Sequence, residues 1–490
     1  MRPLIETLYE NKQMISSGDD MNQQYKTPLF DKLIAHKNKN SISFHVPGHK
    51  NGHVIPEAAR SINLDMLKLD VTELTDLDDL HSPEGVILES EQLLAELYRV
   101  KKSFFLVNGT TVGNLAMVMA AIKEGDTVLV QRNCHKSILH ALQLTHAKPV
   151  FINPEYNDDW HVATGLSVEA VQTAITKYPQ AKALIVTYPN YYGMVFQLDR
   201  IIEIAHEKKI PVLVDEAHGA HFIAGEPFPA SALTLGADVV VQSAHKTLPA
   251  MTMGSYLHFN SSIISLKRVE TYLHMLQSSS PSYLIMASLD LARSYLGTFN
   301  QRDLNKLQSQ IEKFRKELSE IPGLKVLPYK NDFGDLLKIT IQSTRGWSGF
   351  ELQLHMEELG IFAEMADPSN LLLVVPLLKA EATYAFNEVI ELIKTLEMPN
   401  DLVQENFQYN NILIQKRGTS ILELSFKEME KLSRTRRSLS ESIGKISAEM
   451  IVPYPPGVPL LYPGKRLQKK ILNILTGYLK KGQGFKAESR

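Results

Sequence analysis

Lys246 is the residue of this sequence whose position best suits covalent chemistry. It follows the apolar run 237–241, whose β-branched residues are typical of a buried strand in a parallel sheet. Ser243 and His245 lie beside it. Burial in a dry pocket removes water from an ammonium group and lowers its pKa, so a lysine at the end of such a strand can react as a free amine with a carbonyl. For a single lysine considered alone, the simpler alternative to a catalytic role is a surface residue whose methylene groups lie along the protein while its ammonium group stays in water.

Asp215 ends a second apolar run. Residues 210–214 are apolar, Asp215 follows directly, and an amphipathic helix around 201–205 precedes them. The carboxyl ends of parallel strands meet along one edge of a sheet, so we expect Asp215 to lie near Lys246. A turn or helix-capping carboxylate is the alternative.

A small polar loop follows a third apolar run. Residues 104–107 lead into Asn108-Gly109-Thr110-Thr111, and we expect a helix from near Leu115. Backbone amides and hydroxyl groups at the start of a helix bind phosphate. A phosphate loop, a carboxylate and a lysine at neighbouring strand ends are what pyridoxal 5'-phosphate (PLP) requires: an anion site, a partner for the pyridinium nitrogen and an amine for the aldehyde. We therefore expect PLP as the cofactor, bound by Gly109, Thr110, Thr111, Asp215 and Lys246.

Four motifs resemble those of the Orn/Lys/Arg decarboxylase family in order and spacing. They are Asn108-Gly109-Thr110-Thr111, Asn133-Cys134-His135-Lys136-Ser137, Asp215-Glu216-Ala217-His218 and Ser243-Ala244-His245-Lys246. Similar segments occur at 45–49, 278–283 and 453–459, so the resemblance covers the chain from about residue 26 onward. It indicates the short form of the family, because too few residues precede His45 for the receiver-like wing domain of longer members.

The resemblance assigns roles to several side chains. It implies that the His135 ring stacks on the cofactor, which otherwise exposes an aromatic face. It implies phosphate contacts for Ser243 and His245. It also implies that His218 lies beside the cofactor and takes part in catalysis.

The activity implied by the resemblance is PLP-dependent decarboxylation of arginine, lysine or ornithine to the corresponding amine in polyamine metabolism. Another PLP reaction, such as transamination or aldol cleavage, needs much the same lysine, aspartate and phosphate loop, and it stays open. A non-catalytic scaffold or regulator with a PLP fold is the alternative outside enzymes. The presence of Lys246 and Asp215 counts against that last alternative.

A basic substrate requires a carboxylate for its distal cation. The densest acidic segment outside these motifs is 70–79, in which Glu73 and Asp78 are the first candidates. A solvated acidic loop with helix-capping aspartates is the alternative. The resemblance also implies a homodimer or larger homo-oligomer with shared sites, in which Ser279 of the segment 278–280 reaches the phosphate of the neighbouring subunit.

The elements that carry these residues alternate in type along the chain. Short apolar runs alternate with helix-like spacers and occur at 127–130, 149–152, 183–187, 212–214 and 239–241. This pattern predicts a mainly parallel sheet covered by helices on both faces. Together with the resemblance, it predicts an α/β fold: a seven-stranded PLP-binding large domain like that of aspartate aminotransferase, a smaller α+β domain and a C-terminal α+β domain.

The predicted domain limits follow changes in this pattern. They are 1–60 for an N-terminal arm, 61–297 for the large domain, 298–398 for the small domain and 399–490 for the C-terminal domain. The small domain begins with a charged helix at 304–321. The C-terminal domain is expected to contain a basic helix that carries Lys431, Arg434, Arg436 and Arg437.

Composition excludes several other classes of protein. The 490 residues carry a net charge of −2, which gives no electrostatic reason to expect a nucleic acid or an anionic membrane as partner. Cys134 is the only cysteine, so no internal disulfide can form and a reducing compartment is favoured. Residues 1–24 lack the apolar core of a signal peptide, and we expect a soluble, cytoplasmic protein.

Two other motifs lack what their chemistry requires. Residues 215–218, Asp-Glu-Ala-His, also match a motif found in helicases. The sequence, however, has no glycine-rich nucleotide loop that ends in Gly-Lys-Ser or Gly-Lys-Thr. The histidines at 45, 49 and 53 and at 218 and 221 do not form a helical pair with a glutamate base between them. We therefore expect neither a nucleotide motor nor a metal site.

Overall fold

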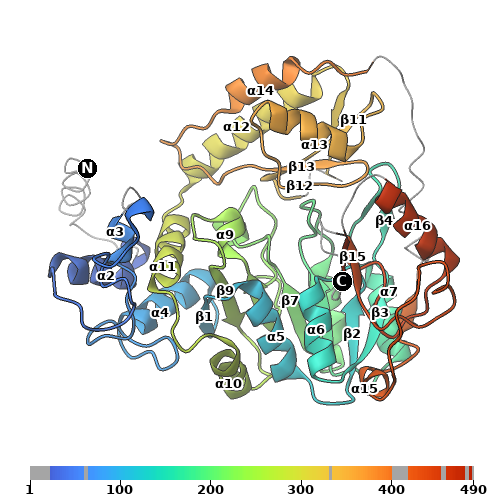
Figure 1. Ribbon diagram of the computed structural model, residues 1–490, viewed down its shortest axis with the longest axis horizontal. Helices are drawn as coiled ribbons and strands as arrows, with labels where there is room; N and C mark the ends of the chain where they lie inside the picture. Colours follow the sequence, from blue (N-terminus) through green and yellow to red (C-terminus); the bar gives the residue numbers. More distant parts are fainter. Residues whose placement is uncertain are drawn as a thin grey trace.

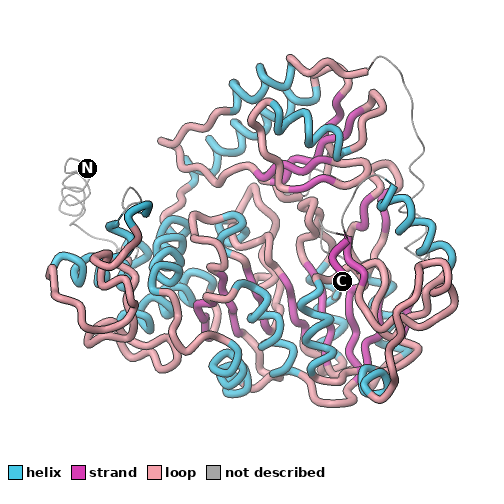
Figure 2. Tube along the Cα trace, in the orientation of Figure 1, coloured by secondary structure: helices cyan, strands magenta, loops and turns pink. Residues whose placement is uncertain are grey.

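An eight-stranded sheet with helices on both faces forms the centre of this computed structural model, which describes residues 23–59, 64–329, 334–399, 418–453, 459–480 and 485–487 (Figures 1 and 2). The strand order is β1-β9-β8-β7-β6-β2-β3-β14. The five strands from β8 to β3 are parallel, and β9 is antiparallel to both of its neighbours. The strands are β1 Lys102–Leu106, β2 Thr127–Gln131, β3 Lys148–Ile152, β6 Ala183–Thr187, β7 Val212–Asp215, β8 Val239–Gln242, β9 Ser255–Phe259 and β14 Thr419–Ile421.

The prediction of an α/β fold with a mainly parallel seven-stranded large-domain sheet is confirmed, with one addition. Strand β14 comes from the C-terminal part of the chain and pairs antiparallel with β3, placing Thr419 opposite Ile152. It therefore covers the edge of the large sheet.

Neighbouring residues of the seven large-domain strands pack into two different cores. On β8, Val239 and Val241 belong to one core, and Val240 belongs to the other. The first core also contains residues of α5 (Gly109–Ala121), α6 (Lys136–Leu144) and α10 (Leu266–Leu276), while the second contains residues of α4 (Val86–Tyr98), α7 (Val168–Lys177), α8 (Leu198–Glu207) and α11 (Tyr283–Gly297). A parallel sheet buried on both faces explains why its strands are continuous apolar runs in the sequence.

Helix α5 packs unusually close to the sheet. A Cβ atom at Gly113 would lie 2.5 Å from a methyl carbon of Val241 and 2.7 Å from one of Leu106, so only glycine permits this approach. The helix begins at Gly109, earlier than the expected start near Leu115. The reason is local: Gly109 has a φ of +72°, which lets the chain turn directly from the loop into the helix.

A second, antiparallel sheet forms the centre of the small domain, at the top of Figure 1. Its order is β10-β11-β13-β12, with strands Leu324–Val326, Lys338–Ser343, Leu371–Val374 and Met365–Ala366 respectively. The helices of this region are α12 Gln301–Ser319, α13 Gly349–Glu358 and α14 Phe386–Lys394. Helix α12 is the charged helix that was expected at 304–321.

The C-terminal part contains α15 (Phe426–Glu430), a two-stranded sheet of β15 (Ile451–Pro453) and β16 (Phe485–Ala487), and α16 (Lys469–Lys480). The expected basic helix at 431–437 is wrong, since α15 ends at Glu430 and the following residues are exposed and non-helical. Leu432, the one apolar residue of that run, is 54% exposed, so a helix there would have no apolar face to bury. The domain limits themselves stay predictions.

The N-terminal segment packs against the large domain through a buried arginine. Arg293 of α11 donates hydrogen bonds to Asp290 and to the backbone carbonyls of Gln24 and Lys26.

The remaining elements are short. Those of the N-terminal region are η1 Gln23–Tyr25, α2 Pro28–Asn38, η2 Glu57–Ala59 and α3 Leu64–Leu67. Those of the large domain are β4 Tyr156–Asn157, β5 Val162–Ala163, η3 Phe222–Ala224 and α9 Ala244–Thr247. Among the described residues, no helix has both the length and the apolar character needed to cross a bilayer.

Candidate active site

Lys246 lies in α9, directly after β8, and contacts a histidine that follows β7. Its Nζ is 3.0 Å from Nε2 of His218. The other ring nitrogen of His218, Nδ1, is 3.0 Å from Nζ of Lys338, the first residue of β11 in the small domain. The ring of Tyr191 lies edge-on to His218, with its centre 5.7 Å from the Lys246 ammonium. Two lysines therefore share one histidine.

The hydrogen bonds around His218 restrict the protonation of the two lysines. A neutral imidazole has one N–H donor and one acceptor, so one of the two amines must accept a hydrogen bond from the ring, which only an uncharged amine can do. Burial, and then the charges of Lys246 and Lys338, hold the pKa of His218 well below its usual value. Burial also lowers the pKa of Lys246, and it lowers that of Lys338 to about 8. The arrangement therefore favours an uncharged lysine near neutral pH.

Asp215 ends β7, with only 3% of its surface exposed. One carboxylate oxygen accepts a hydrogen bond of 2.9 Å from the Asn114 side chain on α5, and the other accepts one of 3.2 Å from the Ala217 amide. The negative charge of Asp215 raises the pKa of Lys246 and so opposes part of the effect of burial. The structure thus brings Asp215 close to Lys246, as the strand ends predict.

His135 caps the start of α6 and belongs to the same hydrogen-bond network. Asn114 donates to the Ser137 hydroxyl at 2.9 Å, and that hydroxyl lies 2.8 Å from Nδ1 of His135. The Ser137 amide also donates to Nδ1, so this nitrogen is an acceptor and the ring proton is on Nε2. Burial lowers the pKa of His135 to about 4, with the charge of Asp215 opposing the shift. A neutral ring is therefore linked to Asp215 through two polar side chains.

The loop before α5 offers free donors beside Ser243. The Thr110 hydroxyl lies 3.0 Å from the Ser243 hydroxyl. The Gly109 amide donates to the Met253 carbonyl, but in the described part of the chain the amides of Thr110 and Thr111 have no acceptor. Free amides at a helix start with two hydroxyl groups beside them fit a phosphate.

His245 makes a different contact from the one implied. Its Nδ1 donates to the Gly254 carbonyl at 3.0 Å, and burial lowers its pKa. The remaining nitrogen, Nε2, can donate to a phosphate only when the ring is protonated. The residues present nevertheless fit the three groups of PLP that need a partner. The loop amides fit the phosphate, Asp215 fits the pyridinium nitrogen and Lys246 fits the aldehyde.

Three of the expected site residues lie apart from this cluster within the chain. Glu73 and Ser279 are exposed. Asp78 accepts hydrogen bonds from five backbone amides before and within the first turn of α4, namely those of residues 79, 84, 85, 87 and 88. Such contacts correspond to the helix-capping alternative for Asp78. No hydrogen bond or ion pair among the described residues links Glu73, Asp78 or Ser279 to Lys246.

Sequence reasoning missed other residues of the cluster. Ser137 ends one of the quoted motifs, so its place there could have marked it, and Asn114 lies three residues after another. Lys338 and Glu364 come from the small domain, where no local pattern marks them. Glu364 is exposed, and its negative charge raises the pKa of Lys246, Lys338 and His245. The described ranges contain no group of three or more potential metal ligands.

Comparison with known proteins agrees with this geometry. A family model for the Orn/Lys/Arg decarboxylase major domain matches residues 27–414, and one for the C-terminal domain of the same family matches 423–488. The uncharacterized protein YaaO of Bacillus subtilis is 47% identical over 92% of this chain and 94% of its own. An arginine decarboxylase of Halalkalibacterium halodurans is 35% identical over 91% and 92% of the two chains.

A solved structure shows the same fold. The lysine decarboxylase LdcF of Francisella novicida superimposes with a TM-score of 0.77 over 95% of this chain and 79% of that chain. Its sequence identity of 21% makes this a likeness of fold alone. The two family models, however, together span nearly the whole chain. The chain therefore belongs to the Orn/Lys/Arg decarboxylase family.

Proposed function

We propose that this chain is a PLP-dependent decarboxylase that converts arginine, lysine or ornithine to the corresponding amine. The observation that carries the proposal is the contact of the Lys246 amine with His218, together with the buried carboxylate of Asp215 and the loop whose Thr110 hydroxyl contacts Ser243. Family membership supports decarboxylation over other PLP reactions. The arginine decarboxylase at 35% identity supports arginine as the first substrate to test.

Each part of the cluster has a separate task in this proposal. Bound PLP supplies a ring that takes up the electron pair left behind when carbon dioxide departs. Asp215, fixed by Asn114 and Ala217, would keep a proton on the ring nitrogen. Lys246 would be the amine that bonds the aldehyde, because it lies three residues after Ser243, whose hydroxyl contacts the loop. The amides of Thr110 and Thr111 and the hydroxyl groups of Thr110 and Ser243 would hold the phosphate, with Gly109 forming the turn before them, and the neutral ring of His135 would supply a flat apolar face.

In this proposal, His218 and Lys338 exchange a proton with the Lys246 amine. The His218 Nε2 atom can accept a proton from Nζ of Lys246 or return one, because it is in direct hydrogen-bond contact. Lys338, at the other ring nitrogen, can supply or take up the proton that leaves His218. The three groups form a short relay into the small domain.

Glu364 is the best candidate within this chain for the distal cation of the substrate. Its charge acts on three residues of the cluster, and its side chain is exposed. Asp78 is less suitable because its carboxylate is already bonded to backbone amides. Glu73 is exposed and stays a candidate for the site of a neighbouring subunit.

We also propose that the chain forms homodimers or larger assemblies in the cytoplasm. The N-terminal segment exposes apolar side chains that a second copy could cover: Phe44 is 94% exposed and Ile42 is 87% exposed. The exposure of Ser279 is consistent with a contact to a neighbouring subunit.

The test uses the full chain loaded with PLP and assayed with arginine, lysine and ornithine separately. Release of carbon dioxide and the matching amine from one of them is the expected result. Formation of a keto acid without carbon dioxide would show a transaminase instead. No turnover of any of the three would favour the non-catalytic alternative.

The same assay tests Glu364. Glu364→Gln should raise the KM of the basic substrate about tenfold with less change in kcat, since the carboxylate binds a part of the substrate that does not react. Glu391→Gln is the matched control, because Glu391 is an exposed carboxylate of the small domain that pairs with Lys394. An unchanged KM in Glu364→Gln removes Glu364 from the proposal without affecting the reaction type.

A further inference from the structure

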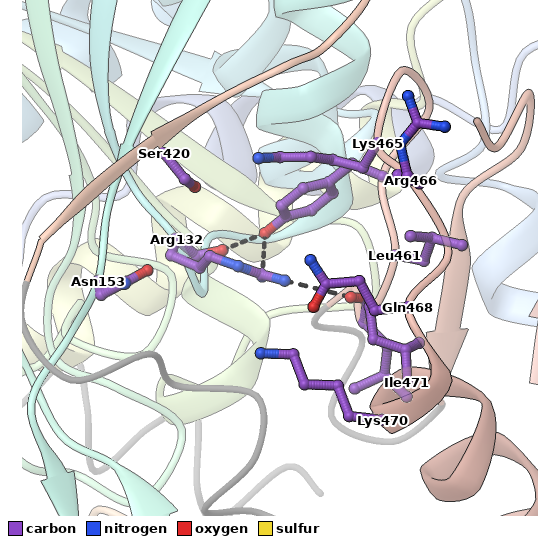
Figure 3. A pocket seen from close by; sticks show the side chains of 11 residues that line it. Arg132, Asn153, Ser420, Leu461, Lys465, Arg466, Gln468, Lys470 and Ile471 are labelled. Carbon is purple, nitrogen blue, oxygen red and sulfur yellow. Dashed lines mark hydrogen bonds between the residues drawn. The ribbon is translucent and has the colours of Figure 1, made fainter. Parts of the chain in front are cut away.

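A cationic pocket lies where the C-terminal part meets the large domain (Figure 3). Its volume is about 90 Å³. Arg132 and Asn153 follow β2 and β3, Ser420 belongs to β14, and the remaining lining residues lie between 460 and 471, up to the first turn of α16. The lining includes none of the residues assigned above to PLP or substrate.

The guanidinium of Arg132 is fixed in the wall of this pocket by uncharged groups. It donates to the carbonyls of Pro459 and Leu460 at 3.1 and 3.2 Å and to the Tyr462 hydroxyl at 2.5 Å. It also lies over the Tyr462 ring, 4.3 Å from the ring centre. None of these partners carries a negative charge, and among the described residues Arg132 has no ion-pair partner.

Two lysines add to this charge. Neither Lys465 nor Lys470 has a hydrogen-bond acceptor or an ion-pair partner for its Nζ among the described residues. Glu423 acts on Lys465, but its carboxylate is paired with Arg466 at 2.8 Å. Burial and the charge of Arg132 lower the pKa of Lys465, the effect expected where like charges lie close together.

The start of α16 supplies neutral donors to the same space. Gln468, Lys470 and Ile471 line the pocket. Within the described ranges, the amides of Lys469 and Lys470 have no acceptor, and the positive end of the dipole of a 12-residue helix lies there. Cations and free amides around one small cavity are the surroundings that bind oxyanions in other folds.

We propose that this pocket binds the phosphate group of an anionic ligand. The volume holds several water-sized groups, which is enough for the five heavy atoms of a phosphate. Three cations without carboxylate partners favour a multiply charged anion over a single carboxylate. Free phosphate and the phosphate end of a nucleotide share this chemistry.

An occupant would join three separate parts of the chain. It would bridge the ends of β2 and β3, the strand β14 and the start of α16. Arg132 is also three residues before His135, so the ligand would act on the loop that carries the proposed stacking residue. Binding should therefore stabilise the junction of the C-terminal part with the large domain.

The test is calorimetric titration of the full chain, loaded with PLP, at constant ionic strength. The probes are inorganic phosphate, pyrophosphate and a nucleoside triphosphate, with chloride as the reference anion. We expect saturable binding with a Kd of about 1 mM or tighter for at least one probe. The double variant Lys465→Gln/Lys470→Gln should weaken this binding by about tenfold or more, a loss of roughly 1.4 kcal/mol.

Lys431→Gln/Lys445→Gln is the matched control, since it removes the same two charges from exposed residues of the C-terminal part that do not line the pocket. It should leave the Kd within about twofold of wild type. A nucleotide that binds more tightly than pyrophosphate identifies contacts beyond the phosphates, and equal affinities identify the phosphate group alone.

Three results would overturn the proposal: no binding of any probe, equal binding in the double variant and wild type, or binding only to protein without PLP. The last result would place the phosphate at the cofactor loop near Thr110. Thermal unfolding of each variant without phosphate confirms that it is folded.

Discussion

Lys338 is an unusual neighbour for a reactive lysine. A buried amine normally pairs with a carboxylate, whereas Lys338 contacts a histidine that also contacts Lys246. When Lys338 is charged, it donates to Nδ1, so the neutral His218 ring carries its proton on Nε2 and donates it to an uncharged Lys246. Lys338 is thus a positioning residue that acts through His218.

Replacing Lys338 should move the pH dependence of the reaction. Lys338 contributes to the lowered pKa of His218, so Lys338→Met should raise that pKa toward 6.5. His218 would then become protonated at a higher pH, and the acid limb of the kcat/KM profile should shift upward by about one unit. Lys338→Arg keeps the charge and should leave the limb near its wild-type position. An acid limb that does not move in Lys338→Met would contradict the relay.

The positions of Lys246 and Asp215 at one sheet edge could be predicted from sequence because Asp215 directly follows an apolar run and Lys246 comes five residues after another. The partners of His218 could not, since Lys338 lies 120 residues beyond it and reaches it only through the packing of the small domain on the large one. Glu364 could not be predicted either, because it also belongs to the small domain. Local patterns report which residues follow a strand, but they contain no information on a side chain brought in from another domain.

Among the elements, β9 is the strand that interrupts the parallel sheet, and a buried histidine links it to both neighbours. His258 lies opposite Ser103 of β1, whose hydroxyl is 2.8 Å from Nδ1. On the other side, Nε2 donates to the Gln242 side chain of β8 at 3.1 Å. Both ring nitrogens are therefore satisfied in the neutral state, and burial lowers the pKa of His258 to about 3.

This histidine should make the stability of the sheet depend on pH. Above pH 6.5, His258 is neutral in both the folded and the unfolded chain. Below it, the unfolded chain takes up a proton that the folded chain resists down to about pH 3, so stability falls across this window. Between about pH 7 and about pH 5 the loss from this residue is about 2 kcal/mol.

The measurement is the free energy of unfolding in urea at the two pH values. His258→Gln should lose about 2 kcal/mol less than wild type on acidification, because glutamine keeps polar contacts without titrating. His53→Gln serves as the control, since His53 is exposed. Equal losses in His258→Gln and wild type would show that other groups dominate acid unfolding.

The elements of the large domain were largely predictable, because strands buried on both faces read as uninterrupted apolar runs. The failures have local causes. The turn at Gly109 starts α5 earlier than its apolar spacing suggests. The basic run at 431–437 has charge but no apolar face, and charge alone does not form a helix. Strand β14 is only three residues long, too short for its alternation to be detected.

For the whole molecule, the proposal that sites are shared between subunits makes a direct prediction. Ser279→Asp should abolish activity by repelling the phosphate of the cofactor in the neighbouring chain, and Lys246→Ala should abolish activity in its own chain. Mixed after unfolding and refolding, the two inactive chains should recover about a quarter of wild-type activity, because half of random dimers are mixed and each has one intact site.

The control is a mixture of Lys246→Ala with Asp215→Ala. Lys246 and Asp215 belong to the same site and come from the same subunit. In a mixed dimer one site therefore lacks Lys246 and the other lacks Asp215, so neither is intact. If the mixture with Ser279→Asp is also inactive, Ser279 does not act across a subunit interface. Light scattering of each mixture shows whether dimers or larger assemblies formed.

The pairing of β14 with β3 also affects the order in which the sheet can form during synthesis of the chain. Synthesis reaches the end of β3 at Ile152, but it reaches Thr419 only 267 residues later (419 − 152). At about 5–20 residues per second, the outer edge of β3 stays uncovered on the ribosome for roughly 10–50 s. During this time its backbone amides and carbonyls can pair with another nascent chain, and a product that stops before β14 keeps that open edge permanently. The C-terminal part therefore completes the outer edge of a sheet whose β3 strand was synthesised 267 residues earlier.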